Sequence, residues 1–258
     1  MPRLPARTVF FASEFWLYMA HTVSFTVTAV YFVQVVDMNP LQLILVGTVM
    51  ELAVFVFEIP TGVLADVYSR RLSLIIGWFI MGAAMILVGG VASFPVILLG
   101  YALWGFGYTF TSGAEQAWIT DEVGVQHVGH VFARGQQLGY VGGLLGIGIS
   151  VAVASWSLSA AVALGGAMSV AFTAFAAVTM PEAGFSKPQE RQLGIVASLH
   201  STASTGVRFI RLQPLLIVIL AIAFFAGAST ETFDRLWEAS RPGRPNALER
   251  LPTATTLS

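Results

Sequence analysis

The chain has 258 residues, of which 56% are hydrophobic and only 10% are charged, whereas soluble domains carry about 25% charged residues. This composition excludes an ordinary soluble domain, because most of the chain has no polar surface to present to water. The net charge of −1 gives no field that would attract nucleic acid, and the absence of cysteine excludes disulfides, a thiol nucleophile and thiolate metal sites.

The first apolar segment follows two basic residues, Arg3 and Arg7, and runs from Thr8 to about Val36. A signal peptide has an apolar core of only about 7–15 residues and ends at a cleavage site made of small residues. This segment is longer than that and has no such site, so we predict that it is retained as the first membrane helix.

Seven apolar segments are long enough to span a membrane, which takes about 20 residues of helix. They cover residues 8–35, 41–64, 72–91, 94–119, 135–156, 159–180 and 212–230. Residues that favour turns separate several of them, as at Asn39-Pro40 and at Ser155-Trp156-Ser157. The sequence therefore predicts an all-α, polytopic membrane protein.

Basic residues fall on one side of these predicted helices. With a cytoplasmic N-terminus, the outer loops between helices contain no Lys or Arg. The inner segments contain nine such residues, namely Arg3, Arg7, Arg70, Arg71, Arg134, Lys187, Arg191, Arg208 and Arg211. Positive charge is retained on the cytoplasmic side, so the pattern predicts a multi-pass protein of the cell (inner or plasma) membrane with its N-terminus inside.

The predicted helices divide the chain into four regions. Residues 1–180 form a six-helix unit, residues 181–211 a cytoplasmic loop, residues 212–230 a seventh helix and residues 231–258 a polar tail. The loop is either a flexible connector or lies partly on the inner leaflet, because Leu193, Val196 and Leu199 recur at helical spacing. The tail is rich in proline and charge and is predicted to be disordered.

The most informative motif is Gly62-Val63-Leu64-Ala65-Asp66-Val67-Tyr68-Ser69-Arg70-Arg71, at the predicted cytoplasmic turn between the second and third helices. It resembles motif A of the major facilitator superfamily, G-x-L-A-D-R-x-G-R-R. The matching residues are Gly62, Leu64, Ala65, Asp66, Arg70 and Arg71. Val67 departs where a basic residue is usual, and Ser69 departs where glycine is usual.

The residues of this motif also have a physical interpretation. Gly62 is expected to allow two helices to approach closely, and Asp66 and Arg70 are spaced to form an ion pair. The resemblance implies that the aspartate stabilises one conformation by facing a helix of the other half of such a transporter. The alternative is a positive-inside anchor with a capping aspartate.

Two further segments are similar to exporters of this superfamily. Residues 105–118 resemble their small-residue fourth helix, but Tyr101 stands where many members carry a membrane-embedded arginine, so proton coupling through that residue is not implied. Residues 139–148 contain five glycines and resemble the glycine-rich exporter motif without its proline. Tight helix packing is the alternative explanation for these glycines. The resemblance covers roughly residues 8–239.

Ionisable residues inside a membrane are costly and are candidates for function. Glu14 and His21 lie two turns apart on the first helix, as do Glu51 and Glu58 on the second. Counted from the cytoplasmic ends of these antiparallel helices, Glu14 and Glu58 share a depth near the inner surface. His21 and Glu51 share a depth near the midplane. We hypothesise that His21 and Glu51 contact substrate or exchange protons; the alternative is a structural hydrogen bond between two packed helices.

A group of charged residues flanks the predicted turn between the fourth and fifth helices. It comprises Glu115, Asp121, Glu122 and Arg134, which we interpret as a cytoplasmic charge network, with direct contact to substrate as the alternative. His127 and His130 are expected in the same loop as solvated side chains, and no pattern of ligands predicts a metal site.

The resemblance implies a secondary transporter with two six-helix halves, each built from two inverted three-helix repeats, that alternate around a site at the midplane. It implies efflux of a drug-like or amphipathic small molecule, with the proton gradient as the driving force and no other cofactor. The expected partners are the substrate and the lipid bilayer, with no nucleic acid and with self-association of copies as a further option.

Two other functions are weighed against transport. An intramembrane enzyme would need a motif such as H-E-x-x-H or G-x-S-x-G, and neither occurs; we therefore expect no enzyme. The other is a truncated half-transporter that moves nothing, since the sequence changes character near Ser240 after one six-helix half and one further helix.

Overall fold

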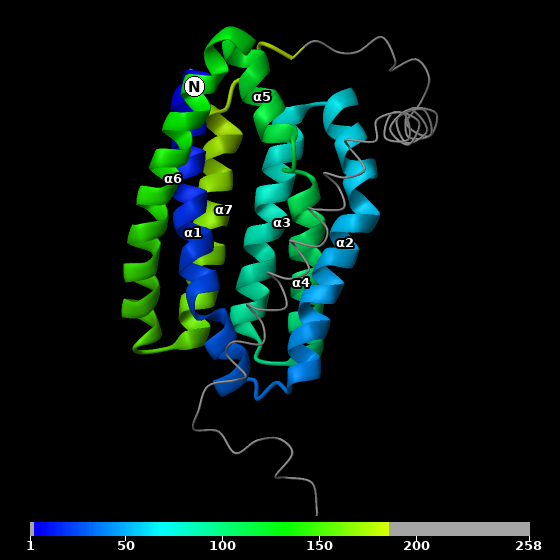
Figure 1. Ribbon diagram of the computed structural model, residues 1–258, viewed down its shortest axis with the longest axis vertical. Helices are drawn as coiled ribbons and strands as arrows, with labels where there is room; N and C mark the ends of the chain where they lie inside the picture. Colours follow the sequence, from blue (N-terminus) through cyan, green and yellow to red (C-terminus); the bar gives the residue numbers. More distant parts are fainter. Residues whose placement is uncertain (1–2, 186–258) are drawn as a thin grey trace, which may run out of the picture. The chain divides into compact units, whose positions relative to one another are not determined.

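The computed structural model describes residues 3–185, and all seven helices found there belong to one bundle (Figure 1). In chain order these are α1 (Ala6–Gln34), α2 (Pro40–Val67), α3 (Arg70–Gly90), α4 (Phe94–Thr109), α5 (Ala114–Val123), α6 (Val125–Ala154) and α7 (Leu158–Thr179). No strand occurs within the described range. The all-α prediction is confirmed.

Six helical segments of the described range are long and apolar enough to cross a membrane. The fourth of these crossings combines α4 and α5 and covers Phe94–Val123. They correspond to the first six predicted spans, so the polytopic membrane architecture is confirmed. The predicted loop 181–211 lies largely, and the seventh helix 212–230 and the tail 231–258 entirely, outside the described residues.

Local sequence signals explain where several helices begin. Asn39 caps α2 by accepting a 3.0 Å hydrogen bond from the backbone N–H of Gln42, and the Gln42 side chain accepts one in return from the Asn39 backbone. Pro40 then occupies the first turn, where its missing N–H costs nothing. The hydroxyls of Ser69 and Ser157 cap α3 and α7 by accepting hydrogen bonds from the backbone N–H groups of Leu72 and Ala160.

The helices pack in an interleaved order that relates the first three crossings to the last three. α1 packs most closely on α6 and α7, while the fourth crossing packs on α2 and α3. The first crossing packs on the fifth and sixth in the same way as the fourth packs on the second and third. The third and sixth crossings, α3 and α7, pack on each other and so occupy equivalent places in the two repeats. This is the relationship expected of two three-helix repeats.

Glycines on α6 allow α1 to approach closely. A Cβ at Gly142 would overlap the carbonyl oxygen of Phe15, and one at Gly146 would lie 2.7 Å from the carbonyl oxygen of Met19. The predicted tight packing of the glycine-rich fifth crossing is therefore what the structure contains. Without a hydrophobic drive in lipid, such backbone proximity is the main source of helix association.

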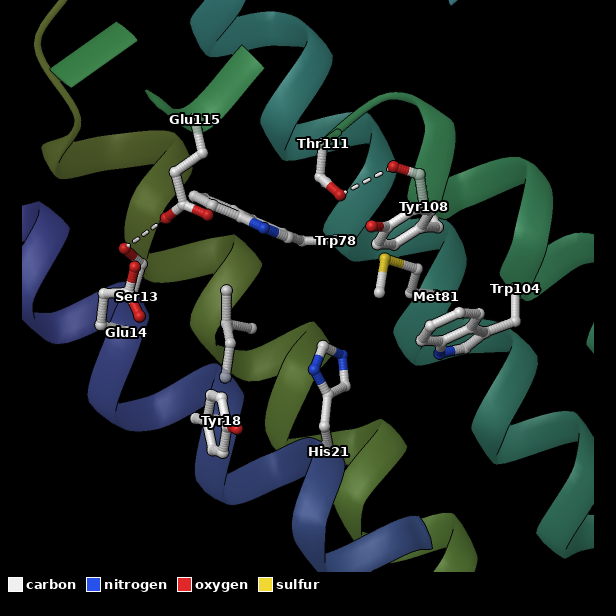
Figure 2. A pocket seen from close by; sticks show the side chains of 11 residues that line it. Ser13, Glu14, Tyr18, His21, Trp78, Met81, Trp104, Tyr108, Thr111 and Glu115 are labelled. Atoms are coloured by element: carbon white, nitrogen blue, oxygen red, sulfur yellow. Dashed lines mark hydrogen bonds between the residues drawn. The ribbon is translucent and has the colours of Figure 1, made fainter. Parts of the chain in front are cut away.

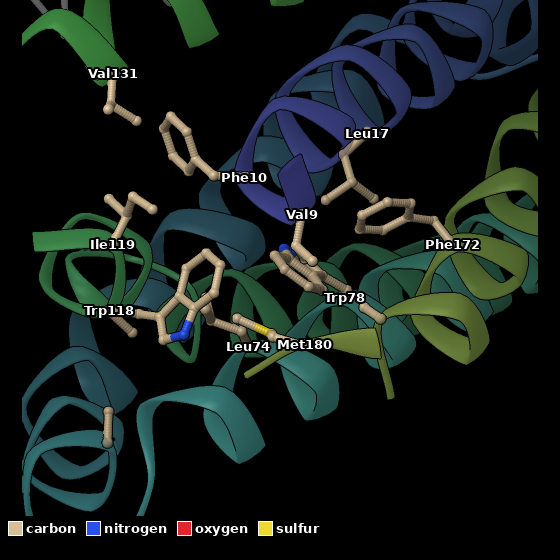
Figure 3. Close-up of a cluster of buried hydrophobic side chains, with 13 residues drawn as sticks. Val9, Phe10, Leu17, Leu74, Trp78, Trp118, Ile119, Val131, Phe172 and Met180 are labelled. Carbon is tan, nitrogen blue, oxygen red and sulfur yellow. The ribbon is translucent and has the colours of Figure 1, made fainter. Parts of the chain in front are cut away.

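A buried cluster joins side chains of α1, α3, α5, α6 and α7 (Figure 3). Phe10 of α1, Trp78 of α3 and Trp118 of α5 belong to it, and the Trp118 side chain is 1% exposed. Its indole N–H donates a 2.9 Å hydrogen bond to the carbonyl oxygen of Pro181. The segment after α7 is thereby held to the bundle.

The fourth and fifth crossings differ from the prediction in their ends. The fourth is interrupted after Thr109, where Gly113 adopts a left-handed φ of 72°, and Gly124 turns the chain into α6 with a φ of 83°. Glycine adopts these angles without the penalty other residues incur. As a result α6 starts ten residues earlier than expected, and His127 and His130 lie on this helix rather than in a loop.

Candidate functional site

A cavity of about 200 Å³ lies between α1 and the broken fourth crossing, with α3 behind it (Figure 2). The residues around it come from four helices and the α4–α5 turn and combine acidic, aromatic and hydroxyl side chains. They are Ser13, Glu14, Leu17, Tyr18, His21, Trp78, Met81, Trp104, Tyr108, Thr111 and Glu115. On α1 the spacing 14, 17, 18, 21 is that of one helix face, which explains why these side chains share the cavity.

Two carboxylates face this cavity from different helices. Glu115 extends from α5 toward α1, where its Oε1 accepts a 2.9 Å hydrogen bond from the hydroxyl of Ser13 (Figure 2). Glu14 follows Ser13 on α1 and is half-buried, and its side chain forms no hydrogen bond or ion pair with any described residue. Of the two acidic groups in the cavity, Glu115 therefore accepts a hydrogen bond from Ser13, and Glu14 accepts none from a described residue.

Aromatic rings form the opposite wall. Trp104 and Tyr108 stack with their ring centroids 5.7 Å apart and their planes 10° from parallel. His21 meets the edge of Trp104 with 6.0 Å between centroids. The indole N–H of Trp104 is buried without a hydrogen-bond partner in the described range, so it is a donor available to a water molecule or a ligand.

A second, larger cavity of about 550 Å³ lies on the other side of α1, against α6. Glu14 and Tyr18 line both cavities, together with Gln136 and Tyr140 of α6 in the second. Gly139 lies against Glu14, since a Cβ placed on it would be 3.4 Å from Oε2 of that residue. The missing side chain at Gly139 thus leaves room for the carboxylate.

The two acidic residues of α2 lie apart from this site. Glu51 is exposed and lines none of the described cavities, although the preceding residue, Met50, packs on Gly105 of α4. Glu58 is half-buried, and its Oε2 has no partner among the described residues. Of the hypothesised pair, His21 lines the cavity, whereas Glu51 is exposed on α2 and lines none of the described cavities.

The motif A turn is held by a charge cluster at the ends of α2, α3 and α5. Arg70 forms an ion pair with Asp121 and a weaker one with Asp66, at 3.6 Å. Its guanidinium also donates a 2.9 Å hydrogen bond to the carbonyl oxygen of Ala117. The predicted pairing of Asp66 with Arg70 occurs, across the turn between two helices rather than along one.

Glu182, after α7, completes this cluster. Its carboxylate accepts hydrogen bonds of 2.8 Å from the Ser69 hydroxyl and 3.0 Å from the backbone N–H of Arg71. A carboxylate at the first turn of a helix is stabilised by the free N–H groups there. Ser69, which replaces the usual glycine of motif A, therefore has a structural role as the cap of α3.

The four charged residues of the predicted network around α5 do not form one connected group. Asp121 pairs with Arg70, and Glu122 accepts a 2.7 Å hydrogen bond from the backbone N–H of Gly184. Arg134 donates to Gln137 on its own helix. Glu115 lines the cavity instead, because it sits on the opposite face of α5 from the Arg70 cluster.

The expected close helix approach at Gly62 stays a prediction, because it does not occur against the residues that the structure describes. A Cβ at this position would meet no described atom within 4 Å. The third and fourth crossings approach closely at other glycines, since a Cβ at Gly77 would lie 2.7 Å from the carbonyl oxygen of Gly107.

Sequence reasoning did not identify Tyr18, Trp104 or Tyr108 as site residues. For Tyr18 the signal was available, because it lies one turn from Glu14 on the helix face that also holds His21. For Trp104 and Tyr108 no signal was available: aromatic residues are frequent throughout the chain, and only the packing of α4 on α3 shows which of them face inward.

Comparison with known proteins gives two results. The family model of the Major Facilitator Superfamily matches residues 10–236. A protein of Bacillus subtilis (strain 168) described as "Uncharacterized MFS-type transporter YxaM" is 28% identical over 102 residues, which cover 40% of this chain and 26% of that protein. The matched segment thus spans about a quarter of that relative's length.

The family match extends over most of the sequence, including the described bundle and the motif A turn. Members of this superfamily are transporters, so the expectation that the chain is not an enzyme is confirmed. We conclude that the chain belongs to the Major Facilitator Superfamily.

Proposed function

We propose that the chain takes part in secondary transport of a small molecule across the cell membrane, with its N-terminus in the cytoplasm and with the cavity beside α1 as part of the substrate path. The observation that carries this proposal is the cavity itself. It lies within the spanning segments and is lined by two carboxylates and an aromatic wall. Unpaired polar groups at such a depth are costly unless they serve a ligand, an ion or a proton.

The packing order supports alternating access as the mechanism. The cavity opens between α1 and the fourth crossing, which are equivalent members of the two repeats. α2 and α6 are the least buried of the crossings, with 11% and 28% of their apolar windows buried. Faces of this kind suit contact with a second six-helix bundle, against which the first can rock.

Proton-coupled efflux is the form of transport that we propose. Carboxylates can bind and release protons, and Glu14 and Glu115 share one cavity, so that substrate and protons would meet at the same groups. Tyr101, in place of the usual arginine, is 4% exposed and packs between Phe25 and Phe32. The coupling would therefore rest on the carboxylates rather than on a basic residue of α4.

Efflux from cells expressing the full chain tests this proposal. A panel of fluorescent dyes and antibiotics is followed beside an empty vector, after an immunoblot has verified the protein in the membrane fraction. Efflux that stops on addition of a protonophore would support the proposal. Absence of efflux at verified expression would favour a membrane protein of this family that does not transport on its own.

A further inference from the structure

The two carboxyl groups of the cavity between α1 and the fourth crossing have no basic Lys or Arg side chain beside them. Glu14 and Glu115 both line the cavity, whereas no Lys or Arg lines this cavity or the two neighbouring ones along α1. His21 is the remaining group there that carries a positive charge when it is protonated. Even with a proton on His21, two ionised carboxylates would leave one negative charge.

The basic residues of the described range are placed elsewhere. Arg70 pairs with Asp121, Arg71 donates a 2.6 Å hydrogen bond to the carbonyl oxygen of Ala177, and Arg134 donates to Gln137. Arg3 and Arg7 are exposed near the N-terminus. The bundle therefore supplies no basic side chain that would pair with these carboxylates when they are ionised.

The wall opposite the carboxylates suits a particular kind of cation. The stacked rings of Trp104 and Tyr108 line this wall, and Trp78 lies beside Glu115 (Figure 2). Aromatic faces attract positive charge, most strongly where water is excluded. A small inorganic cation would instead need about six oxygen ligands, which the aromatic wall does not offer.

We propose that this cavity binds a monovalent organic cation with an aromatic or apolar body. Its charged group lies at Glu14 and Glu115, and its body lies against Trp104 and Tyr108. This assignment of a substrate class rests on the proposed transport function. The carboxylate of Glu14 lines the cavity and forms no hydrogen bond or ion pair with a described residue, so it can face the charged group of such a ligand.

Equilibrium binding to the purified full chain tests the assignment without requiring transport. The probe is radiolabelled 1-methyl-4-phenylpyridinium, whose charge lies at one end of an aromatic body, and the competitor is biphenyl-4-carboxylate, a soluble anion of similar shape. We expect saturable binding of the cation that the anion does not displace from the protein. Because a charge-assisted contact and a cation–π contact are lost, Glu14→Gln and Glu115→Gln should each weaken binding about tenfold or more, and Trp104→Leu several-fold.

Matched variants keep the test decisive. Asp37→Asn removes one carboxylate at the exposed turn after α1, where φ is 56°, a conformation that asparagine also tolerates; it should leave binding unchanged. Glu14→Asp keeps the charge and should retain most of the affinity. Should one Glu→Gln variant fail to elute as a folded species, the other, on a different helix, provides the same measurement.

The outcomes separate this inference from the proposed transport. Cation binding that depends on Glu14, without efflux in cells, would support the binding class and count against transport. Efflux of other compounds by a protein that does not bind 1-methyl-4-phenylpyridinium would leave transport standing and overturn the binding class. Equal binding by wild type and both Glu→Gln variants would overturn it as well.

Discussion

The hydroxyl of Ser13 donates a 2.9 Å hydrogen bond to Oε1 of Glu115 and so connects the first crossing to α5 at the edge of the cavity. Ser13 is 1% exposed, and the same hydroxyl also lies 2.8 Å from the carbonyl oxygen of Phe10. A short, buried side chain therefore determines where a carboxylate 102 residues away can lie.

Replacing Ser13 with alanine should destabilise the protein. The carboxylate of Glu115 would lose its donor from α1, and an unsatisfied buried acceptor costs about 1–3 kcal/mol. We expect a lower melting temperature in detergent, measured by fluorescence-detected gel filtration. Ser155→Ala is the control, because that exposed hydroxyl donates only to Ala152 of its own helix. Equal melting temperatures for both variants would contradict a role for the Ser13 contact.

Alanine at Gly142 should separate α1 from α6. Its Cβ would overlap the carbonyl oxygen of Phe15, and relief of such overlap by backbone shifts typically costs about 1–3 kcal/mol. We expect reduced thermal stability in detergent. Gly148→Ala provides the comparison on the same helix, since a Cβ there meets no described atom within 4 Å. A Gly148→Ala variant as unstable as Gly142→Ala would point to helix-wide effects instead of this contact.

The two acidic partners of Arg70 should contribute unequally to stability. Asp121 is the closer partner and its side chain is 30% exposed, whereas Asp66 lies 3.6 Å away with 66% of its side chain exposed. Exposed pairs contribute about 0–1 kcal/mol, so Asp66→Asn should change the melting temperature little. Asp121→Asn should lower the melting temperature clearly, because loss of the closer partner reduces the free energy of unfolding by about 1–3 kcal/mol. The reverse order would show that the ion pairs have been ranked incorrectly.

These two variants also separate stability from function. If motif A acts on conformation, as the resemblance implies, Asp66→Asn should reduce transport while leaving thermal stability nearly intact. Efflux rates normalised to membrane expression measure this. Unchanged efflux in Asp66→Asn would favour the simpler interpretation of the motif as a positive-inside anchor.

Removal of the Glu182 carboxylate should release the segment after α7 from the start of α3. Glu182→Ala removes both acceptor oxygens from the Ser69 hydroxyl and the Arg71 backbone N–H. Loss of a helix-terminal acceptor costs about 1 kcal/mol. Limited proteolysis should then cleave this segment faster. Glu182→Gln keeps one acceptor oxygen and should fall between wild type and Glu182→Ala; identical cleavage of all three would contradict the contact.

Much of the bundle could be predicted from the sequence, because lipid imposes strong rules on composition. Apolar length sets the number of crossings, and the glycines of the fifth crossing indicated tight packing, which Gly142 and Gly146 display. The spacing of Asp66 and Arg70 likewise predicted their ion pair. The ion pair depends on residues that are close in the sequence, whereas apolar length and glycine content are properties of a whole segment.

What only the tertiary structure decided is how the helices are rotated against one another. Periodicity places Glu14 and His21 on one face of α1, and Glu51 and Glu58 on one face of α2, but it does not say which neighbour each face meets. The break at Gly113 turns Glu115 toward Ser13, and the packing of Met50 on Gly105 leaves Glu51 outside the cavity. Such rotations follow from side-chain packing between segments that are distant in the sequence. The local pattern of the sequence contains no information about this packing.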